Sequence, residues 1–313
     1  MHRKSNPNRS NDRLLKMPGK LDRGPVEFES RISKHEGEIM AIASHEVVTL
    51  APTSTIMGAV EAMTKFGFRR IPITDPGTHK VRGIVTAGDI IDLMGGGSKY
   101  NLVKGKHGGN LIAAINDSVR EIMSTQVVTV NRDAKIAEVA DLIVTRKIGG
   151  FPVVNREGVI QGIVTERDVM KALVTERDTR QVSEVMSRGL KVTGPDTPIS
   201  AATREMIQHK FRRLPVVSGD ILFGIVTNSD VMRYLGTGQV FQKLVTGSIA
   251  EVMELPVRTI LSSELITITP ECSISEAAGE MLQKGIGALP VIQDSRLVGL
   301  VTEFDLVRAF SAG

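Results

Sequence analysis

Four threonine–aspartate pairs, with the two residues three positions apart, are the groups in this sequence best suited to bind a small molecule. Each pair closes a segment G-I-V-T-x-x-D, or G-L-V-T-x-x-D in the last copy. The pairs are Thr86 and Asp89, Thr165 and Asp168, Thr227 and Asp230, and Thr302 and Asp305. An aspartate fixed at a helix start can accept hydrogen bonds from both vicinal hydroxyls of a ribose, and the threonine hydroxyl can bond to sugar or phosphate.

The same pairs also have a purely structural interpretation. A threonine that precedes a helix, with an acidic residue three positions later, is close to a capping box, which satisfies free backbone N–H groups. Capping alone would tolerate Ser, Asn, Glu or Gln, whereas this chain uses Thr and Asp in all four copies. Shared ancestry of the copies could also produce that uniformity. The pattern favours ligand binding and leaves capping open.

Two pairs of arginines form a second group with chemical potential, one in the first copy and one in the third. They are Arg69, Arg70, Arg212 and Arg213. The matching positions of the second and fourth copies, 149–150 and 287–288, hold only glycine or alanine. Paired arginines beside an apolar strand need anions, so we expect either phosphate groups or ion pairs there. The small residues would leave room for a ligand or for a neighbouring side chain.

A basic residue one turn after the aspartate recurs in three copies, as Lys171, Arg233 and Arg308, while the first copy has Asp92. We expect these side chains to form ion pairs on the helix surface first and to serve as phosphate ligands only second.

The elements that position these groups repeat as β-α-β-β-α. In the first copy, residues 47–50 read as a strand, 55–66 as an amphipathic helix, and 71–74 and 83–86 as two more strands, with a helix beginning near Asp89. Equivalent helices are predicted near 135–147, 199–210 and 274–284. In all four copies a strand-like run ends 20 residues before the proline of the second strand, so one unit has been used four times.

The spacing between copies indicates that a pair of repeats was itself duplicated. The motif aspartates recur at intervals of 79, 62 and 75 residues, which is long, short, long. A single unit of this size would leave sheet faces uncovered. We therefore expect an α+β fold of two pseudo-symmetric modules, 38–180 and 181–313. The expected repeats span about 40–95 and 120–180 in the first module, and about 181–237 and 248–313 in the second.

Composition narrows the class of protein. The chain has 313 residues and one cysteine, Cys272, so no internal disulfide is possible and a reducing, cytoplasmic location is expected. No apolar run approaches the roughly 20 residues that a membrane helix needs, so no membrane partner is expected. The first residues also lack the apolar stretch of a secretory signal.

The positive charge lies at the N-terminus. Residues 1–24 hold seven Lys/Arg and two acidic residues, a net charge of +5, and the whole chain carries +4, which leaves −1 for the remainder. The segment 1–37 is therefore expected to be a basic, disordered tail. It could contact nucleic acid or simply keep the protein soluble, and its lack of aromatic residues weakens the nucleic-acid interpretation.

No pattern of a catalytic or metal site is present in the sequence. The six histidines and one cysteine lack the spacing of metal ligands, and there is no G-x-S-x-G segment. Gly105-Lys106-His107 lacks the upstream glycine and the following Ser/Thr of a phosphate-binding loop. We expect no metal site, no catalytic residues and no enzyme activity.

Four β-α-β-β-α units that end in G-h-V-T-x-x-D resemble CBS domains, named after cystathionine β-synthase. The resemblance covers about residues 38–313 and implies two Bateman modules, which can close into one disc within a monomer or assemble as a homodimer. The layout is similar to the gamma subunit of AMP-activated protein kinase and to stand-alone prokaryotic CBS proteins. In that family, clefts between paired domains bind adenosine-containing ligands.

The resemblance also implies roles for single residues. The motif aspartates Asp89, Asp168, Asp230 and Asp305 would hold ribose hydroxyls, and Thr86, Thr165, Thr227 and Thr302 would lie at ribose or phosphate. Arg69, Arg70, Arg212 and Arg213 would reach phosphates. Thr49, Thr129 and Thr267 would lie near adenine, whereas the third repeat has Val192 at that position. Four sites are therefore an upper limit.

The resemblance implies a regulatory protein that senses AMP, ADP, ATP or S-adenosylmethionine, with Mg²⁺ accompanying ATP, and that signals to a protein partner by conformational change. No catalytic cofactor is implied. Two alternatives stay open. One is a nucleic-acid-binding or transcription-regulating protein that uses its basic tail, with the repeats as the responsive body. The other is a structural interaction subunit whose clefts bind nothing.

Overall fold

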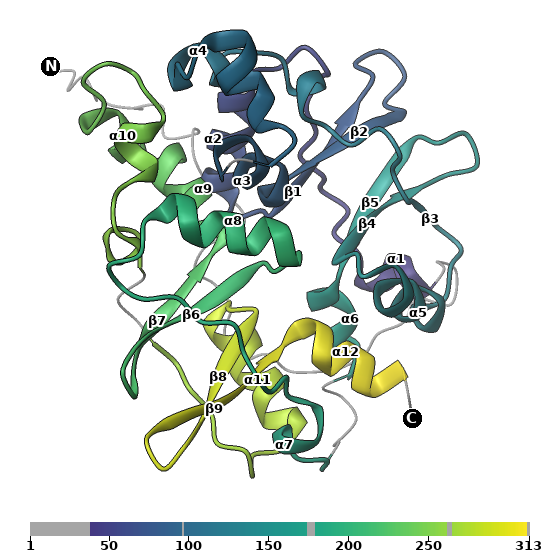
Figure 1. Ribbon diagram of the computed structural model, residues 1–313. Helices are drawn as coiled ribbons and strands as arrows, with labels where there is room; N and C mark the ends of the chain where they lie inside the picture. The colour runs from purple at the N-terminus through teal and green to yellow at the C-terminus, as the bar shows by residue number, and fades with distance from the viewer. Residues whose placement is uncertain (1–37, 96, 174–178, 262–264, 312–313) are drawn as a thin grey trace, which may run out of the picture. The chain divides into compact units, whose positions relative to one another are not determined.

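The computed structural model describes residues 38–95, 97–173, 179–261 and 265–311. Its helices and strands follow one another in the order shown in Figure 1. The basic tail predicted at residues 1–37 lies outside the described residues.

The first repeat shows how local sequence produces each element. Helix α2 (Ile56–Phe66) begins at Thr55, whose side chain accepts a hydrogen bond from the Gly58 N–H at 3.0 Å. It ends at Gly67, which adopts a left-handed conformation with φ of 68°. The chain then forms the antiparallel hairpin β1 (Arg70–Thr74) and β2 (Val81–Thr86), and continues into α3 (Ala87–Gly95).

The other three repeats have the same order of elements. The second has β3 (Val130–Asn131), α5 (Ile136–Arg146), β4 (Gly150–Val154), β5 (Ile160–Thr165) and α6 (Glu166–Leu173). The third has α8 (Ile199–His209), β6 (Arg213–Ser218), β7 (Ile221–Thr227) and α9 (Asn228–Gly236). The fourth has α11 (Ile274–Lys284), β8 (Ala288–Gln293), β9 (Arg296–Thr302) and α12 (Glu303–Ser311). The predicted helices and hairpins are confirmed to within a few residues.

Short helices connect the repeats. The α-helices among them are α4 (Leu111–Ile115), α7 (Val182–Val185) and α10 (Ala250–Met253), and a further short helix, α1 (Glu38–Ile42), precedes the first repeat. A π-helix spans Leu102–Lys106, and 3-10 turns span Val119–Glu121, Gln239–Gln242 and Val257–Thr259.

The strand predicted at residues 47–50 is much shorter than expected. It is reduced to one parallel bridge between Leu50 and Ile73, with a hydrogen bond from the Thr74 N–H to the Leu50 carbonyl at 2.9 Å. The chain turns immediately afterwards, where the Ser54 N–H donates to the Ala51 carbonyl at 3.0 Å. In the second repeat the equivalent strand, β3, has two residues.

The apolar cores join repeats that are not neighbours in the chain. One cluster of buried residues combines side chains of the first and third repeats, including Val60 and Leu235. The other combines the second and fourth repeats, including Ile143 and Val307. Helix α3 packs on α8, and α12 packs on α5 and α6. These contacts bury helix faces that an isolated repeat would leave exposed.

Neighbouring repeats meet through their hairpins. A β-bridge joins Lys80 and Val159 of the first and second repeats, and β7 contacts β9 between the third and fourth. Each repeat therefore contacts its neighbour in sequence through strands and a more distant repeat through helices. The division into modules at about residue 180 stays a prediction.

No helix within the described part of the chain is long and apolar enough to cross a membrane.

Candidate functional site

The register of each hairpin brings the two sequence signals to the same end of the repeat. Arg70 pairs with Thr86 across the first hairpin, and Arg213 pairs with Thr227 across the third. In the second repeat the residue opposite Thr165 is Gly150. The arginine position and the threonine–aspartate step are therefore adjacent in every repeat, although 14 to 16 residues separate the paired positions in sequence.

Each motif aspartate is held by its own threonine. One carboxylate oxygen, Oδ2, accepts from both the backbone N–H and the hydroxyl of the threonine. The N–H and hydroxyl distances are 2.6 and 2.7 Å at Asp89, 2.9 and 2.7 Å at Asp168, 2.8 and 2.7 Å at Asp230, and 3.1 and 2.6 Å at Asp305. The step thus fixes the carboxylate in the manner of a capping box and leaves the other oxygen, Oδ1, to be used elsewhere.

The four Oδ1 atoms differ in what they contact. The Oδ1 atom of Asp89 pairs with the ammonium of Lys99. Arg233 reaches Asp230 at 2.8 Å and Arg308 reaches Asp305 at 3.1 Å, which confirms the i,i+3 ion pairs expected there. In the described structure, Asp168 Oδ1 has no such contact and Lys171 makes no hydrogen bond to it. Asp92, where the other repeats carry a basic residue, instead accepts from the Lys99 backbone N–H at 2.8 Å.

Burial also distinguishes these carboxylates. It raises the pKa of Asp168, and hydrogen bonds from Thr165 only partly oppose that rise. Burial likewise raises the pKa of Asp305, against the hydrogen bond from Thr302 and the charge of Arg308. Both groups are therefore more easily protonated than an exposed aspartate.

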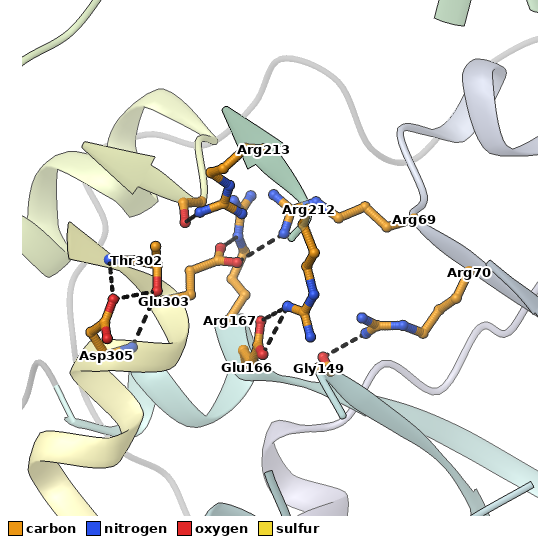
Figure 2. A network of polar contacts seen from close by, with 11 residues as sticks. Arg69, Arg70, Gly149, Glu166, Arg167, Arg212, Arg213, Thr302, Glu303 and Asp305 are labelled. Atoms are coloured by element: carbon orange, nitrogen blue, oxygen red, sulfur yellow. Dashed lines mark hydrogen bonds and ion pairs between the residues drawn. The ribbon is translucent and has the colours of Figure 1, made fainter. Parts of the chain in front are cut away.

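Two of the arginines are bonded to neutral groups. Arg70 donates to the carbonyl of Gly149 at 2.6 Å, and Arg213 donates to the carbonyl of Gly287 at 2.7 Å. Burial lowers the pKa of Arg70 to about 10, and burial likewise lowers the pKa of Arg213 to about 10. Both remain charged at neutral pH, so each is a half-buried cation that donates to a carbonyl rather than to a carboxylate (Figure 2).

The other two arginines meet buried glutamates. Arg212 Nη1 contacts both carboxylate oxygens of Glu166, at 2.9 and 2.8 Å. Arg69 Nη1 donates to Glu303 Oε2 at 2.9 Å, and Arg167 Nε donates to Glu303 Oε1 at 2.7 Å. Figure 2 shows these side chains converging from different repeats. The ion-pair alternative therefore applies to Arg69 and Arg212, whereas phosphate binding by Arg70 and Arg213 stays a prediction.

Together these side chains form what we call the arginine cluster: Arg69, Arg70, Arg167, Arg212, Arg213, Glu166 and Glu303. Five cations and two carboxylates give it a formal charge of +3. Burying both glutamates is tolerable because each is paired with arginine. A site for a multiply charged anion needs positive charge in excess of its own carboxylates. Within the described residues, the Nη2 atom of Arg167 is buried without a hydrogen-bond partner.

The small residues are predicted to leave room for a ligand or a neighbouring side chain. The arginine side chains themselves occupy that space. A Cβ added at Gly149 would lie 2.8 Å from the guanidinium of Arg212, and one at Gly287 would lie 2.7 Å from that of Arg69. One at Gly150 would overlap the guanidinium of Arg70. Glycine at these positions is what allows arginines of the first and third repeats to reach the second and fourth.

A cavity of about 620 Å³ opens onto the cluster. Its walls include all four predicted arginines and the ligand-binding candidates Thr86, Thr227 and Asp230. Val128 and Ile266 lie on its wall, but the neighbouring Thr129 and Thr267 are exposed and are not part of the lining. The cavity therefore joins Thr86 and the threonine–aspartate step of the third repeat to the four paired arginines of the cluster.

The remaining candidates lie apart from this cavity. Asp89, Thr165, Asp168, Thr302 and Asp305 do not contribute to its described lining, and neither does Thr49, which is half-buried. These residues stay predicted site residues of their own repeats.

Sequence reasoning missed Glu166, Glu303 and Arg167. A signal for the glutamates was available: the residue after the motif threonine is glutamate only in the two repeats that lack the arginine pair. At this position the arginine-bearing repeats have Ala87 and Asn228. Arg167 has no such signal, since the fourth repeat has Phe304 there. In the part of the chain that the structure describes, no group of three or more His, Cys, Asp or Glu residues could hold a metal ion.

Comparison with known proteins provides independent evidence for the family of this chain. The family model for the CBS domain matches residues 37–96, 119–175, 182–237 and 257–312. The uncharacterized protein MJ1225 of Methanocaldococcus jannaschii is 38% identical over 276 residues, covering 87% of this chain and 99% of that protein. A 33.4 kDa protein encoded in a ribosomal RNA operon of Thermofilum pendens is 30% identical over 255 residues, covering 82% and 85%.

Solved structures of similar proteins have the same fold as this chain. A crystal structure of MJ1225, described as that of a candidate archaeal homologue of γ-AMPK, matches with a TM-score of 0.84 over 87% of this chain and 99% of that one. An uncharacterized conserved protein from Pyrococcus horikoshii, 20% identical, matches with a TM-score of 0.56 over 88% and 99%, which shows a common fold alone.

Proposed function

Because the chain belongs to the CBS domain family, we propose that it is a regulatory protein that binds an adenosine-containing ligand and transmits its presence to a protein partner. The observation that carries the proposal is the cavity of about 620 Å³, which is lined by Thr227 and Asp230 and by four arginines of the cluster: Arg69, Arg70, Arg212 and Arg213. A nucleoside phosphate needs both kinds of group, since its ribose hydroxyls are donors and its phosphates are anions.

The charge of the cluster favours some adenosyl ligands over others. With a formal charge of +3, it suits the phosphates of AMP, ADP or ATP. S-adenosylmethionine carries a positive sulfonium, which five arginines would repel. The likeness to a protein described as a candidate γ-AMPK homologue supports the same choice. We therefore favour an adenine nucleotide as the ligand.

The cluster also supplies a route for signalling. It draws side chains from all four repeats, so a ligand bound there would contact several repeats at once. A ligand shifts the equilibrium between two arrangements only by its difference in affinity for them. Phosphates that pull arginines of the first and third repeats together would favour the arrangement in which those arginines converge.

Calorimetric titration of the full chain with AMP, ATP and S-adenosylmethionine tests the proposal. We expect AMP or ATP to bind and S-adenosylmethionine to bind more weakly or not at all. Asp230→Ala should weaken nucleotide binding. If none of the three ligands binds, the proposed function is wrong.

A further inference from the structure

Two glutamates lie at one repeated position inside the arginine cluster. Glu166 and Glu303 each follow the motif threonine, and their relative exposures are only 3% and 2%. Their backbone N–H groups donate to the carbonyls of Gly149 and Gly287, at 3.1 and 3.2 Å. Glutamate and glycine therefore face each other in the second and fourth repeats.

The other two repeats reverse this arrangement. The Ala87 N–H donates to the Arg69 carbonyl at 2.9 Å, and the Asn228 N–H donates to the Arg212 carbonyl at 3.0 Å. In these two repeats the residue before the first hairpin strand is an arginine, and the residue after the motif threonine is not acidic. Each cation therefore finds its carboxylate only in another repeat: Arg69 of the first with Glu303 of the fourth, and Arg212 of the third with Glu166 of the second.

Glu303 is ionised and held by two arginines. Burial would raise the pKa of the Glu303 carboxyl, but Arg69 and Arg167 outweigh it and the pKa lies below its ordinary value. Arg212 and Arg69 are 40% and 37% exposed at their side chains, whereas their acid partners are 4% and 3% exposed. The carboxylates are thus fixed and the arginines have an accessible side.

A carboxylate and a phosphate use the same donors of a guanidinium. The two arginine pairs, Arg69-Arg70 and Arg212-Arg213, all line the cavity. Of these four, only Arg69 and Arg212 have a carboxylate partner, while Arg70 and Arg213 are bonded to carbonyls. Extending the proposed function, we infer that Glu166 and Glu303 are built-in counter-anions, which ligand phosphates displace from Arg212 and Arg69. Arg70 and Arg213 receive phosphate without displacement.

The displacement couples repeats. When phosphate takes Arg212, the third repeat loses its ion pair with the second, and when phosphate takes Arg69, the first repeat loses its ion pair with the fourth. Glu303 keeps Arg167 of the second repeat in either case. Ligand binding would therefore loosen defined contacts between repeats, which is a physical basis for the change sensed by a partner.

Replacement of the glutamates tests the inference. AMP and adenosine are titrated into the full-length wild type, Glu166→Gln and Glu303→Gln, with Glu157→Gln as a control that removes one exposed carboxylate outside the cluster. Loss of a competing anion should tighten AMP binding about tenfold in the cluster variants and leave adenosine unchanged. The control should match the wild type. Unchanged or weaker AMP binding in both cluster variants overturns the inference and leaves the proposed function intact.

Two further measurements guard against variants that do not fold and against failure of the proposed function. A structure of the wild-type chain with AMP should show at least one of the Arg212–Glu166 and Arg69–Glu303 pairs opened beyond 4 Å, with phosphate oxygens on the freed arginine. If AMP does not bind, so that the proposed function fails, the same structure is determined with inorganic pyrophosphate. Retention of both ion pairs with the anion bound, or no anion bound in the cluster, overturns the counter-anion role.

Discussion

Arg212 Nη1 contacts both carboxylate oxygens of Glu166, at 2.9 and 2.8 Å, across 46 residues of chain and between two different repeats. The relationship unites two sequence features that look unrelated in isolation. One is an arginine beside an apolar strand, and the other is a glutamate at a helix start. Their pairing explains how the carboxylate of Glu166 can be buried, because it is compensated by a half-exposed guanidinium. The proposed counter-anion role of Glu166 rests on this contact.

The ribose assignment predicts that a single aspartate can be decisive. Asp168 is the motif aspartate whose Oδ1 contacts no basic side chain in the described structure, so we expect its site to accept ribose hydroxyls most readily. Asp168→Ala should weaken adenosine binding at the corresponding site by about 10- to 100-fold, because hydrogen bonds to a charged acceptor contribute about 1.5–3 kcal/mol. Calorimetry gives the affinity, and Asp168→Asn separates charge from shape. An isotherm unchanged by either substitution would rule out ribose binding at Asp168.

The close approach of Arg70 to Gly150 predicts a steric requirement for glycine. In Gly150→Val, the new side chain would overlap the Arg70 guanidinium and lie 2.7 Å from the Val164 carbonyl oxygen. We expect a loss of about 1–3 kcal/mol in the free energy of unfolding, measured by urea denaturation, together with weaker AMP binding.

Gly279→Ala provides the matched control, because Gly279 lies within α11 and a Cβ there would meet nothing within 4 Å. That change should stabilise the protein by up to about 1 kcal/mol. If Gly150→Val were as stable as the control, the arginine would not be packed as described.

The lowered pKa of Glu303 predicts that this carboxylate stabilises the fold at neutral pH and that its contribution is lost in acid. A carboxyl whose pKa is depressed on folding contributes stability at pH values above its unfolded pKa, and this is lost as pH falls through the folded value. At pH 7, Glu303→Gln should be less stable than the wild type by about 3 kcal/mol, because it leaves Arg69 and Arg167 without their carboxylate. The gap should narrow steadily below about pH 4.

Thermal or urea unfolding of both proteins from pH 7 to pH 3 provides the comparison. Asp168 and Asp305, whose pKa values are raised, act in the opposite direction in both proteins and cancel in the difference. A gap that stays constant over this range would show that Glu303 is not an ionised partner of the arginines.

The position of Lys99 predicts that the four motif aspartates do not bind ribose equally well. Its ammonium pairs with Asp89 Oδ1, and Asp92 holds its backbone in place, so a ribose at the first repeat must displace a lysine. Lys99→Met should raise the number of adenosine molecules bound, or tighten the weakest site about tenfold, in calorimetry. Lys171→Met, which removes a lysine that makes no hydrogen bond to Asp168 in the described structure, is the control. Identical isotherms for the wild type and Lys99→Met would contradict the blocking role.

Local signals in the sequence identified most of the elements. The apolar spacing of 55–66 and the turn that follows produce α2, and the hydrophobic-proline steps produce the first strands of the hairpins. The threonine–aspartate step was recognisable because its partners are three residues apart. The strand at 47–50 was overestimated, since apolar composition predicts burial but not how many residues pair before a turn.

What the sequence could not supply was the partner of each charged group across repeats. Arg69 and Glu303 are 234 residues apart, and no local pattern links them. Comparison of the four copies position by position would have exposed the alternation of arginine and glutamate, but not which arginine meets which glutamate. That pairing depends on the packing of the first repeat on the third and of the second on the fourth, through helix faces that have similar apolar patterns.

The most direct test of the account compares AMP with adenosine by calorimetry, in the wild type and in Arg70→Gln/Arg213→Gln. These ligands differ only in the phosphate, and the two arginines are the half-buried cations of the cluster that donate to carbonyls rather than to carboxylates. We predict that AMP binds at least about tenfold more tightly than adenosine to the wild type, and that this advantage disappears in the variant while adenosine binding persists. Equal affinities in the wild type, or an undiminished advantage in the variant, would contradict the claim that the arginine cluster binds phosphate.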